Sequence, residues 1–69
     1  MISHVREHRL RQNGMNQQQL ADNVLVSRQT VVAIERGDYN PSVKLSLLLA
    51  RALSTRVEEL FELEEKDHA

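Results

Sequence analysis

The sequence predicts one small all-α domain, built from five short helices. Its 69 residues are enough for a single domain of this kind. Val, Ile and Thr show no sustained period-two alternation, which is the pattern that marks strands. Glycine and proline are scarce and divide the chain into helix-sized segments at Gly14, Gly37 and Pro41. Because no internal repeat divides it further, residues 1–69 are predicted to form one unit.

The composition excludes several classes of protein. The chain is 41% hydrophobic and 28% charged, as in ordinary globular domains. It has no cysteine, which excludes disulfides and thiolate metal sites. No apolar run approaches the roughly 18 residues of a membrane span, and the N-terminal MISHVREHR lacks the apolar stretch of a signal peptide. We therefore predict a cytoplasmic protein that needs no cofactor and contacts no membrane.

We do not expect an enzyme or a metal site. No nucleophile is paired with a base in the sequence. Residues 4–8 match the H-x-x-E-H pattern of some zinc proteases. This match falls on a terminal helix, in a chain with little room for a substrate cleft, so packing and solvation explain its two histidines better.

Charge is distributed unequally along the chain. Residues 1–36 carry five arginines against three acids, whereas residues 37–69 carry four bases against seven acids. This asymmetry is compatible with a basic binding face and an acidic far end. Two ordinary solvated surfaces would show the same asymmetry, so charge alone does not decide between the two interpretations.

Capping residues and apolar spacing place the five helices. We expect helices over residues 4–12, 17–24, 28–36, 43–53 and 57–61. A side chain that can cap a helix precedes each of the first four, namely Ser3, Asn16, Ser27 and Ser42. Gly14 ends the first helix, and Gly37 stands where a left-handed residue ends the third. The fourth has a wide apolar set that predicts a central, mostly buried helix: Val43, Leu45, Leu47, Leu48, Leu49, Ala52 and Leu53.

The second and third helices are predicted to form a helix-turn-helix unit over about residues 17–36. They are separated by residues 25–27 alone, and the apolar side chains around this turn share one interior: Leu20, Val24, Val26, Val31 and Ile34. The small Ala21 lets the two helices cross closely. The buried stripe of the third helix leaves its opposite face exposed.

This exposed face suits double-stranded DNA. It carries Arg28, Gln29, Val32, Ala33 and Arg36. Arginine can bond bidentately to guanine, glutamine can do so to adenine, and the two small apolar side chains can touch a thymine methyl. Asn16 and Gln17 begin the preceding helix, where free N–H groups and the helix dipole attract a phosphate. The alternative for each residue is a solvated position without a ligand.

The stretch SRQTVVAIERGDYNPS is typical of a known family. Around it, residues 5–63 resemble the Xre/Cro-type helix-turn-helix transcriptional regulators of prokaryotes, and most of all their small single-domain branch. The resemblance implies a five-helix lambda-repressor-like fold and a homodimer that binds its operator sequence-specifically. We therefore expect a transcriptional repressor that binds a palindromic operator on double-stranded DNA.

The resemblance also implies roles for individual residues. Arg28, Gln29 and Ala33 match base-contacting positions, and we add Val32 from the same face. The predicted contacts to the DNA backbone are Asn16, Gln17, Arg36, Tyr39, Asn40 and Lys44. For Tyr39 the alternative is a position that covers the edge of the core. Arg9 and Glu35 match a pair that often forms a buried ion bridge in the family.

The sequence departs from the family at several positions. Leu25 replaces the usual glycine of the turn, at a cost of about 1 kcal/mol if its backbone is left-handed. Ser54 and Arg56 replace the usual glycine and serine before the last helix, which weakens its caps. The segment from Arg9 to the first glycine is one residue longer than usual. Leu48 replaces a residue that is frequently polar, so an apolar side chain reaches the surface.

The C-terminal residues 57–69 are the predicted dimerisation end, with Leu48, Phe61 and Leu63 in the interface. The acidic tail is either a solvated end or, through the alternation in FELE, a strand that pairs with residues 1–3. A rival function is an antitoxin, in which the same DNA-binding domain also neutralises a partner toxin. The six residues EEKDHA that follow Leu63 offer little for that role.

Overall fold

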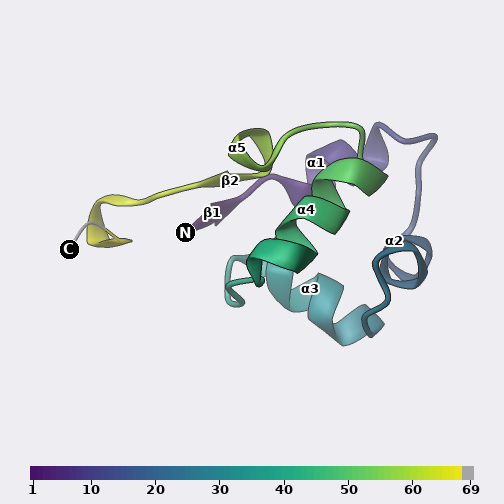
Figure 1. The fold of residues 1–69 in the computed structure, drawn as a ribbon, viewed down its shortest axis with the longest axis horizontal. Helices are drawn as coiled ribbons and strands as arrows, with labels where there is room; N and C mark the ends of the chain where they lie inside the picture. Colours follow the sequence, from purple (N-terminus) through teal and green to yellow (C-terminus); the bar gives the residue numbers. More distant parts are fainter. Residues whose placement is uncertain (68–69) are drawn as a thin grey trace.

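The computed structural model describes residues 1–67, in which five α-helices surround one core and the two ends pair as short strands (Figure 1). In chain order the elements are β1 (Ile2–Ser3), α1 (Val5–Leu10), α2 (Gln17–Val24), α3 (Arg28–Arg36), α4 (Val43–Ala52), α5 (Val57–Leu60), β2 (Phe61–Glu62) and the 3-10 helix η1 (Glu65–Asp67). The predicted five-helix fold with a terminal strand pairing is therefore confirmed. The last two residues of the predicted dimerisation segment lie outside the described range.

Side-chain caps fix where three of the helices begin. At α2 the side-chain oxygen of Asn16 accepts a bond from the Gln19 N–H at 2.8 Å, and the side-chain oxygen of Gln19 accepts one from the Asn16 N–H at 2.9 Å. This reciprocal pair is a capping box. The hydroxyl of Ser27 accepts from the Thr30 N–H at the start of α3, and Ser42 caps α4 in the same way. The predicted caps of these helices are confirmed.

Helix α1 is shorter than the sequence predicts. It begins at Val5 and not at residue 4, and the Ser3 hydroxyl accepts a bond from the Val5 N–H at 3.3 Å. It ends at Leu10, two residues before the predicted end. The physical reason is a turn in which Asn13 and Gly14 both have left-handed backbones, with φ of 55° and 69°.

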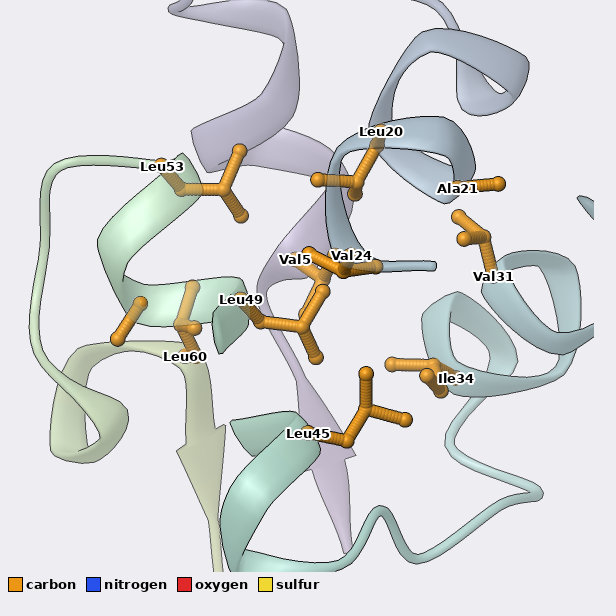
Figure 2. Packing of buried hydrophobic residues seen from close by; sticks show 11 residues of the cluster. Val5, Leu20, Ala21, Val24, Val31, Ile34, Leu45, Leu49, Leu53 and Leu60 are labelled. Atoms are coloured by element: carbon orange, nitrogen blue, oxygen red, sulfur yellow. The ribbon is translucent and has the colours of Figure 1, made fainter. Parts of the chain in front are cut away.

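The core draws apolar side chains from all five helices (Figure 2). Its largest fully buried members are Leu20, Ile34, Leu49, Leu60, Val5 and Val31. The prediction of a mostly buried α4 was wrong on one side of that helix. Leu45 and Leu49 are buried, but Val43 is 77% exposed and Leu47 is 59% exposed. One stripe of α4 suffices to face this small core, and the remaining apolar residues project outward.

The chain ends form a two-stranded antiparallel pair, with Ile2 opposite Glu62 and Ser3 opposite Phe61. Residue 61 was predicted to end the fifth helix; instead its backbone is extended and it begins β2. The His4 ring also contacts Glu62, at 2.6 Å between Nε2 and Oε1. Of the two interpretations of the tail, strand pairing is thus confirmed for Phe61–Glu62.

The short helix α5 lacks a side-chain cap, as the departures from the family pattern predict. Its N-cap residue is Arg56, whose side chain makes no capping bond. Ser54, which stands where glycine is usual, has a left-handed backbone with φ of 54°. No helix within residues 1–67 is long and apolar enough to cross a membrane.

Candidate nucleic-acid interface

The turn between α2 and α3 sets the direction of α3. Ala21 is fully buried where the helices meet, and its carbonyl accepts a bond from the Val26 N–H at 3.1 Å. Val31 and Ile34 of α3 point into the core. The opposite side of α3 is consequently left free, which is the arrangement of a helix-turn-helix unit.

Leu25 occupies this turn with the left-handed conformation expected there, at φ 61° and ψ 41°. Its side chain is 87% exposed. The leucine therefore gains almost no burial in the described domain while it carries the strain that a glycine would avoid.

The four residues predicted to contact bases lie on α3. Arg28 and Gln29 are exposed in its first turn, immediately after the Ser27 cap. Val32 and Ala33 follow one turn later and are half-buried. The structure brings all four onto the part of α3 that begins at the turn, with the two long polar side chains nearest the N-terminus of the helix.

The residues at the start of α2 have partners within the protein. The carboxamide oxygen of Asn16 accepts the capping bond, so the side-chain NH2 group is the part of Asn16 that can donate to a phosphate. The Gln17 amide nitrogen donates to Glu35 Oε1 at 3.1 Å. Gln17 therefore ties the start of α2 to α3, a link that the sequence did not predict.

Glu35 also joins α1 to α3 through the predicted ion pair with Arg9. The Arg9 Nε donates to Glu35 Oε2 at 2.7 Å, and Nη2 donates to Oε1 at 3.2 Å. A third bond runs from Arg9 Nη1 to the Met15 carbonyl at 2.6 Å. Both charged side chains are more than nine-tenths buried. The extra residue before Gly14 is taken up in the turn that follows α1, and the pair is preserved.

The loop between α3 and α4 is held against the N-terminus of the chain. Gly37 has a left-handed backbone with φ of 79°, and an added Cβ would lie 2.6 Å from the Met1 carbonyl oxygen. Both the backbone angle and the close approach require glycine at this position. Beyond it, Tyr39 and Asn40 are exposed in the loop, and Lys44 is exposed in the first turn of α4.

The predicted loop contacts do not all lie together. Tyr39, Lys44 and Leu48 line a hollow of about 300 Å³ beside Leu25, next to the turn. Asn40 lines a different hollow, which also includes Phe61 and Leu63.

This placement also separates the residues predicted for the dimer interface. Phe61 and Leu63 line one hollow with Met1 and Val57, whereas Leu48 lines the hollow beside the turn. Leu48 is half-buried, and it does not bring the exposed apolar side chain that was expected at this position.

Comparisons with known proteins agree with this geometry. Residues 5–60 match a helix-turn-helix family model. The chain is 46% identical over 67 residues to the uncharacterized HTH-type transcriptional regulator YgzD of Bacillus subtilis, covering 97% of this chain and all of that protein. An uncharacterized HTH-type transcriptional regulator of Archaeoglobus fulgidus is 40% identical, over 97% of this chain and 94% of its own. One of Methanothermobacter thermautotrophicus is 45% identical, over 88% of each chain.

The matched region includes all five α-helices described above, and the relatives have nearly the same length as this chain. Within residues 1–67, the α2–α3 unit supplies the exposed helix that such regulators need to contact DNA. The chain therefore belongs to the Xre-type helix-turn-helix family of DNA-binding transcriptional regulators.

Proposed function

We propose that the protein is a repressor that binds a palindromic operator as a homodimer, with α3 of each subunit in the major groove. The observation that carries this proposal is the exposed first turn of α3. Arg28 and Gln29 project there from a helix that is capped by Ser27 and anchored by its buried stripe. Because the core holds α3, these two side chains are presented to a duplex without rearrangement of the fold.

Two sets of residues have different tasks in this proposal. Arg28 and Gln29 supply base preference through bidentate bonds, with Val32 and Ala33 against thymine methyl groups. The backbone contacts supply affinity and fix the register of the protein on the duplex, and they come from Asn16, Gln17, Arg36, Tyr39, Asn40 and Lys44. The second set acts on any sequence, so it also gives weaker non-specific binding that depends strongly on salt.

Dimerisation would make the protein more selective for its DNA sequence, because two half-sites would be contacted in place of one. Two recognition helices about 34 Å apart would contact half-sites one turn of DNA apart. A protein bound across such a site would repress by denying it to other DNA-binding proteins. The cytoplasm is the compartment that we propose for this activity.

Selection of bound duplexes from a random DNA pool tests this function. We expect a palindromic consensus, with half-site centres about 10 base pairs apart. Reporter transcription from a promoter that carries the consensus should fall when the protein is present. A pool that shows no enrichment over a protein-free control would contradict DNA recognition. An enriched sequence without two-fold symmetry would contradict the dimer geometry alone.

A further inference from the structure

A basic hollow of about 570 Å³ lies where α1, α2 and α3 meet. The ion pair of Arg9 and Glu35, together with Gln17, contributes its buried part. Three exposed arginines also line it, namely Arg6 from α1 and Arg28 and Arg36 from α3, together with the half-buried Val32. Arg6 lies outside the helix-turn-helix unit and is not among the residues predicted from the sequence to contact DNA.

The hollow carries an excess of positive charge. Glu35 is the one acid among its lining residues, and its carboxylate is bonded to Arg9 and Gln17. Arg6, Arg28 and Arg36 take part in none of the ion pairs found within residues 1–67. Three like charges around one hollow repel each other, so an anion that enters it is bound favourably.

The spacing of the arginines favours a polyanion over a single small anion. Arg28 and Arg36 are the first and last residues of α3, so their Cα atoms are about 12 Å apart at a rise of about 1.5 Å per residue. One strand of a duplex advances by the same distance over roughly three to four nucleotides. A strand of DNA can therefore contact both ends of α3 and still pass Arg6.

We propose that Arg6 binds a DNA phosphate, and that this hollow holds the sugar-phosphate backbone along one side of the groove that α3 enters. The contact extends the DNA-binding surface from the helix-turn-helix unit to α1. Arg9 acts differently, because its guanidinium is bonded to Glu35 and to the Met15 carbonyl and holds the hollow in shape. This inference rests on the proposed binding of duplex DNA through α3.

The test is the salt dependence of DNA affinity for Arg6→Gln, with Arg11→Gln as the matched control. Both changes remove one exposed arginine charge from the same segment of the chain, but Arg11 does not line the hollow. Affinity is measured by fluorescence anisotropy for the selected operator and for an unrelated duplex, between 50 and 200 mM salt. Circular dichroism establishes that both variants keep the helical fold.

For Arg6→Gln we expect weaker binding to both duplexes by a similar factor. The slope of log affinity against log salt should fall in magnitude by about 0.9, the loss of one phosphate contact. The ratio of wild-type to variant DNA affinity should consequently fall about threefold between 50 and 200 mM salt. Arg11→Gln should leave the slope nearly unchanged.

Three outcomes would overturn the role of Arg6 while leaving DNA binding through α3 intact. These are an unchanged slope for Arg6→Gln, an equal loss of slope for Arg11→Gln, and a change of base preference in place of uniform weakening. If the wild-type protein bound neither duplex in a salt-dependent manner, the proposed function would fail together with this inference.

Discussion

Leu25 combines an unfavourable backbone with an unburied side chain. Its left-handed conformation costs about 1 kcal/mol or more for a residue with a Cβ, and glycine avoids this cost. A fully buried leucine would recover about 1.5–3 kcal/mol, but this side chain is 87% exposed. The balance at this position therefore favours glycine, even after the greater freedom of glycine in the unfolded chain is counted.

We expect Leu25→Gly to raise the free energy of unfolding by up to about 1 kcal/mol. Urea denaturation followed by circular dichroism measures the change. The matched control is Leu47→Gly, which alters another exposed leucine in the interior of α4 and should lower stability by about 1 kcal/mol. A clear fall in the urea midpoint of Leu25→Gly would show that the leucine makes a packing contact that its exposure does not reveal.

Among the described residues, the buried ion pair of Arg9 and Glu35 is the polar contact whose disruption we expect to lower the free energy of unfolding most. Removing one partner leaves a buried charge without compensation, which typically destabilises a protein by about 3–5 kcal/mol. A domain of this size has little stability in reserve. We expect Arg9→Met to be largely unfolded at 37 °C, as measured by thermal denaturation.

The double variant Arg9→Met/Glu35→Leu tests whether the unpaired charge of Glu35 causes the loss of stability in Arg9→Met. It replaces both buried ions by apolar side chains, so it should recover much of the stability lost in Arg9→Met. If the double variant were as unstable as the single one, the bond from Arg9 to the Met15 carbonyl would matter more than the ion pair.

Arg28 is the residue that we expect to control base preference. Arg28→Ala should weaken binding to the preferred site by about 1–3 kcal/mol and relax preference at one base position in each half-site. Duplex selection with the variant measures this directly. Arg51→Ala is the control, because it removes an exposed arginine from α4 instead of α3. An unchanged consensus with Arg28→Ala would refute the assignment of α3 as the recognition helix.

At the scale of elements, the Ser27 cap of α3 contributes to the stability of the fold and also fixes the helix turn that carries the candidate base contacts. The Ser27 hydroxyl accepts a bond from the Thr30 N–H and so closes the first turn of α3, which carries Arg28 and Gln29. Ser27→Ala should lower the free energy of unfolding by about 1 kcal/mol, whereas Ser27→Thr should retain most of it. Chemical denaturation of the two variants checks this. Equal stability of both variants and the wild type would mean that the cap bond is not needed for α3.

The two terminal segments are also joined by charged groups. The Met1 ammonium contacts Glu64 and Asp67, at 2.9 and 3.0 Å. The hydrogen bonds that the Met1 ammonium donates to Glu64, and then to Asp67, raise its pKa above the ordinary 8.0. The Glu64 N–H, and then the ammonium, lower the pKa of the Asp67 carboxyl below its ordinary 3.8.

These shifts predict a pH window for attachment of the tail. The raised pKa of Met1 stabilises the contact fully below pH 8.0, and the effect is lost as pH rises through the raised value. The lowered pKa of Asp67 stabilises it above pH 3.8, and the effect is lost as pH falls through the lowered value. We expect the NMR chemical shift of the Glu64 amide to change at the low-pH and high-pH limits of this window and to change little between them.

Acetylation of the Met1 amine tests this assignment, because it removes the ammonium while leaving Asp67 in place. The movement of the Glu64 signal at high pH should then disappear. A signal that titrates at high pH to the same extent after acetylation would show that another group is responsible.

Local signals explain why some elements were predicted well. The bounds of α2 and α3 follow from Asn16, Ser27 and Gly37, which act within one turn of the helix ends that they define. The outer face of α3 follows equally from the spacing of its buried residues. These features need no knowledge of the rest of the fold.

Features that depend on distant partners were predicted less well. Phe61 leaves the helix because β1 offers it a strand to pair with. The apolar spacing of residues 57–61 favoured a helix there, and the alternation in FELE indicated the pairing with residues 1–3 as only one of two interpretations. The bond between Gln17 and Glu35 and the place of Arg6 beside α3 depend likewise on how three helices meet. The sequence therefore predicted the exposed face of α3 but not that Arg6 of α1 lines the same hollow as Arg28 and Arg36.

At the scale of the whole molecule, the exposed face of α3 and the paired termini are distinct surfaces. The C-terminal segment extends away from the helices in Figure 1. It carries Leu63, which is 64% exposed, next to the half-buried Phe61. A second subunit bound at this end would leave α3 free for DNA. We therefore keep the C-terminal end, with Phe61 and Leu63, as the proposed dimer interface. Leu48 lines the separate hollow beside the turn and is left out of this proposal.

Dimer formation through this end must overcome the repulsion between acidic tails. Exposed charges about 10 Å apart interact weakly at physiological salt, whereas burial of a Phe and a Leu on each chain contributes several kcal/mol. Burial should prevail, and low salt should loosen the dimer slightly. In sedimentation at tens of micromolar we expect a wild-type dimer and a Leu63→Asp monomer with reduced operator affinity, both with unchanged helical content. Leu10→Asp changes an exposed leucine on α1 and should still dimerise. A monomeric wild type, or a Leu63→Asp variant that sediments as a dimer, would exclude this interface.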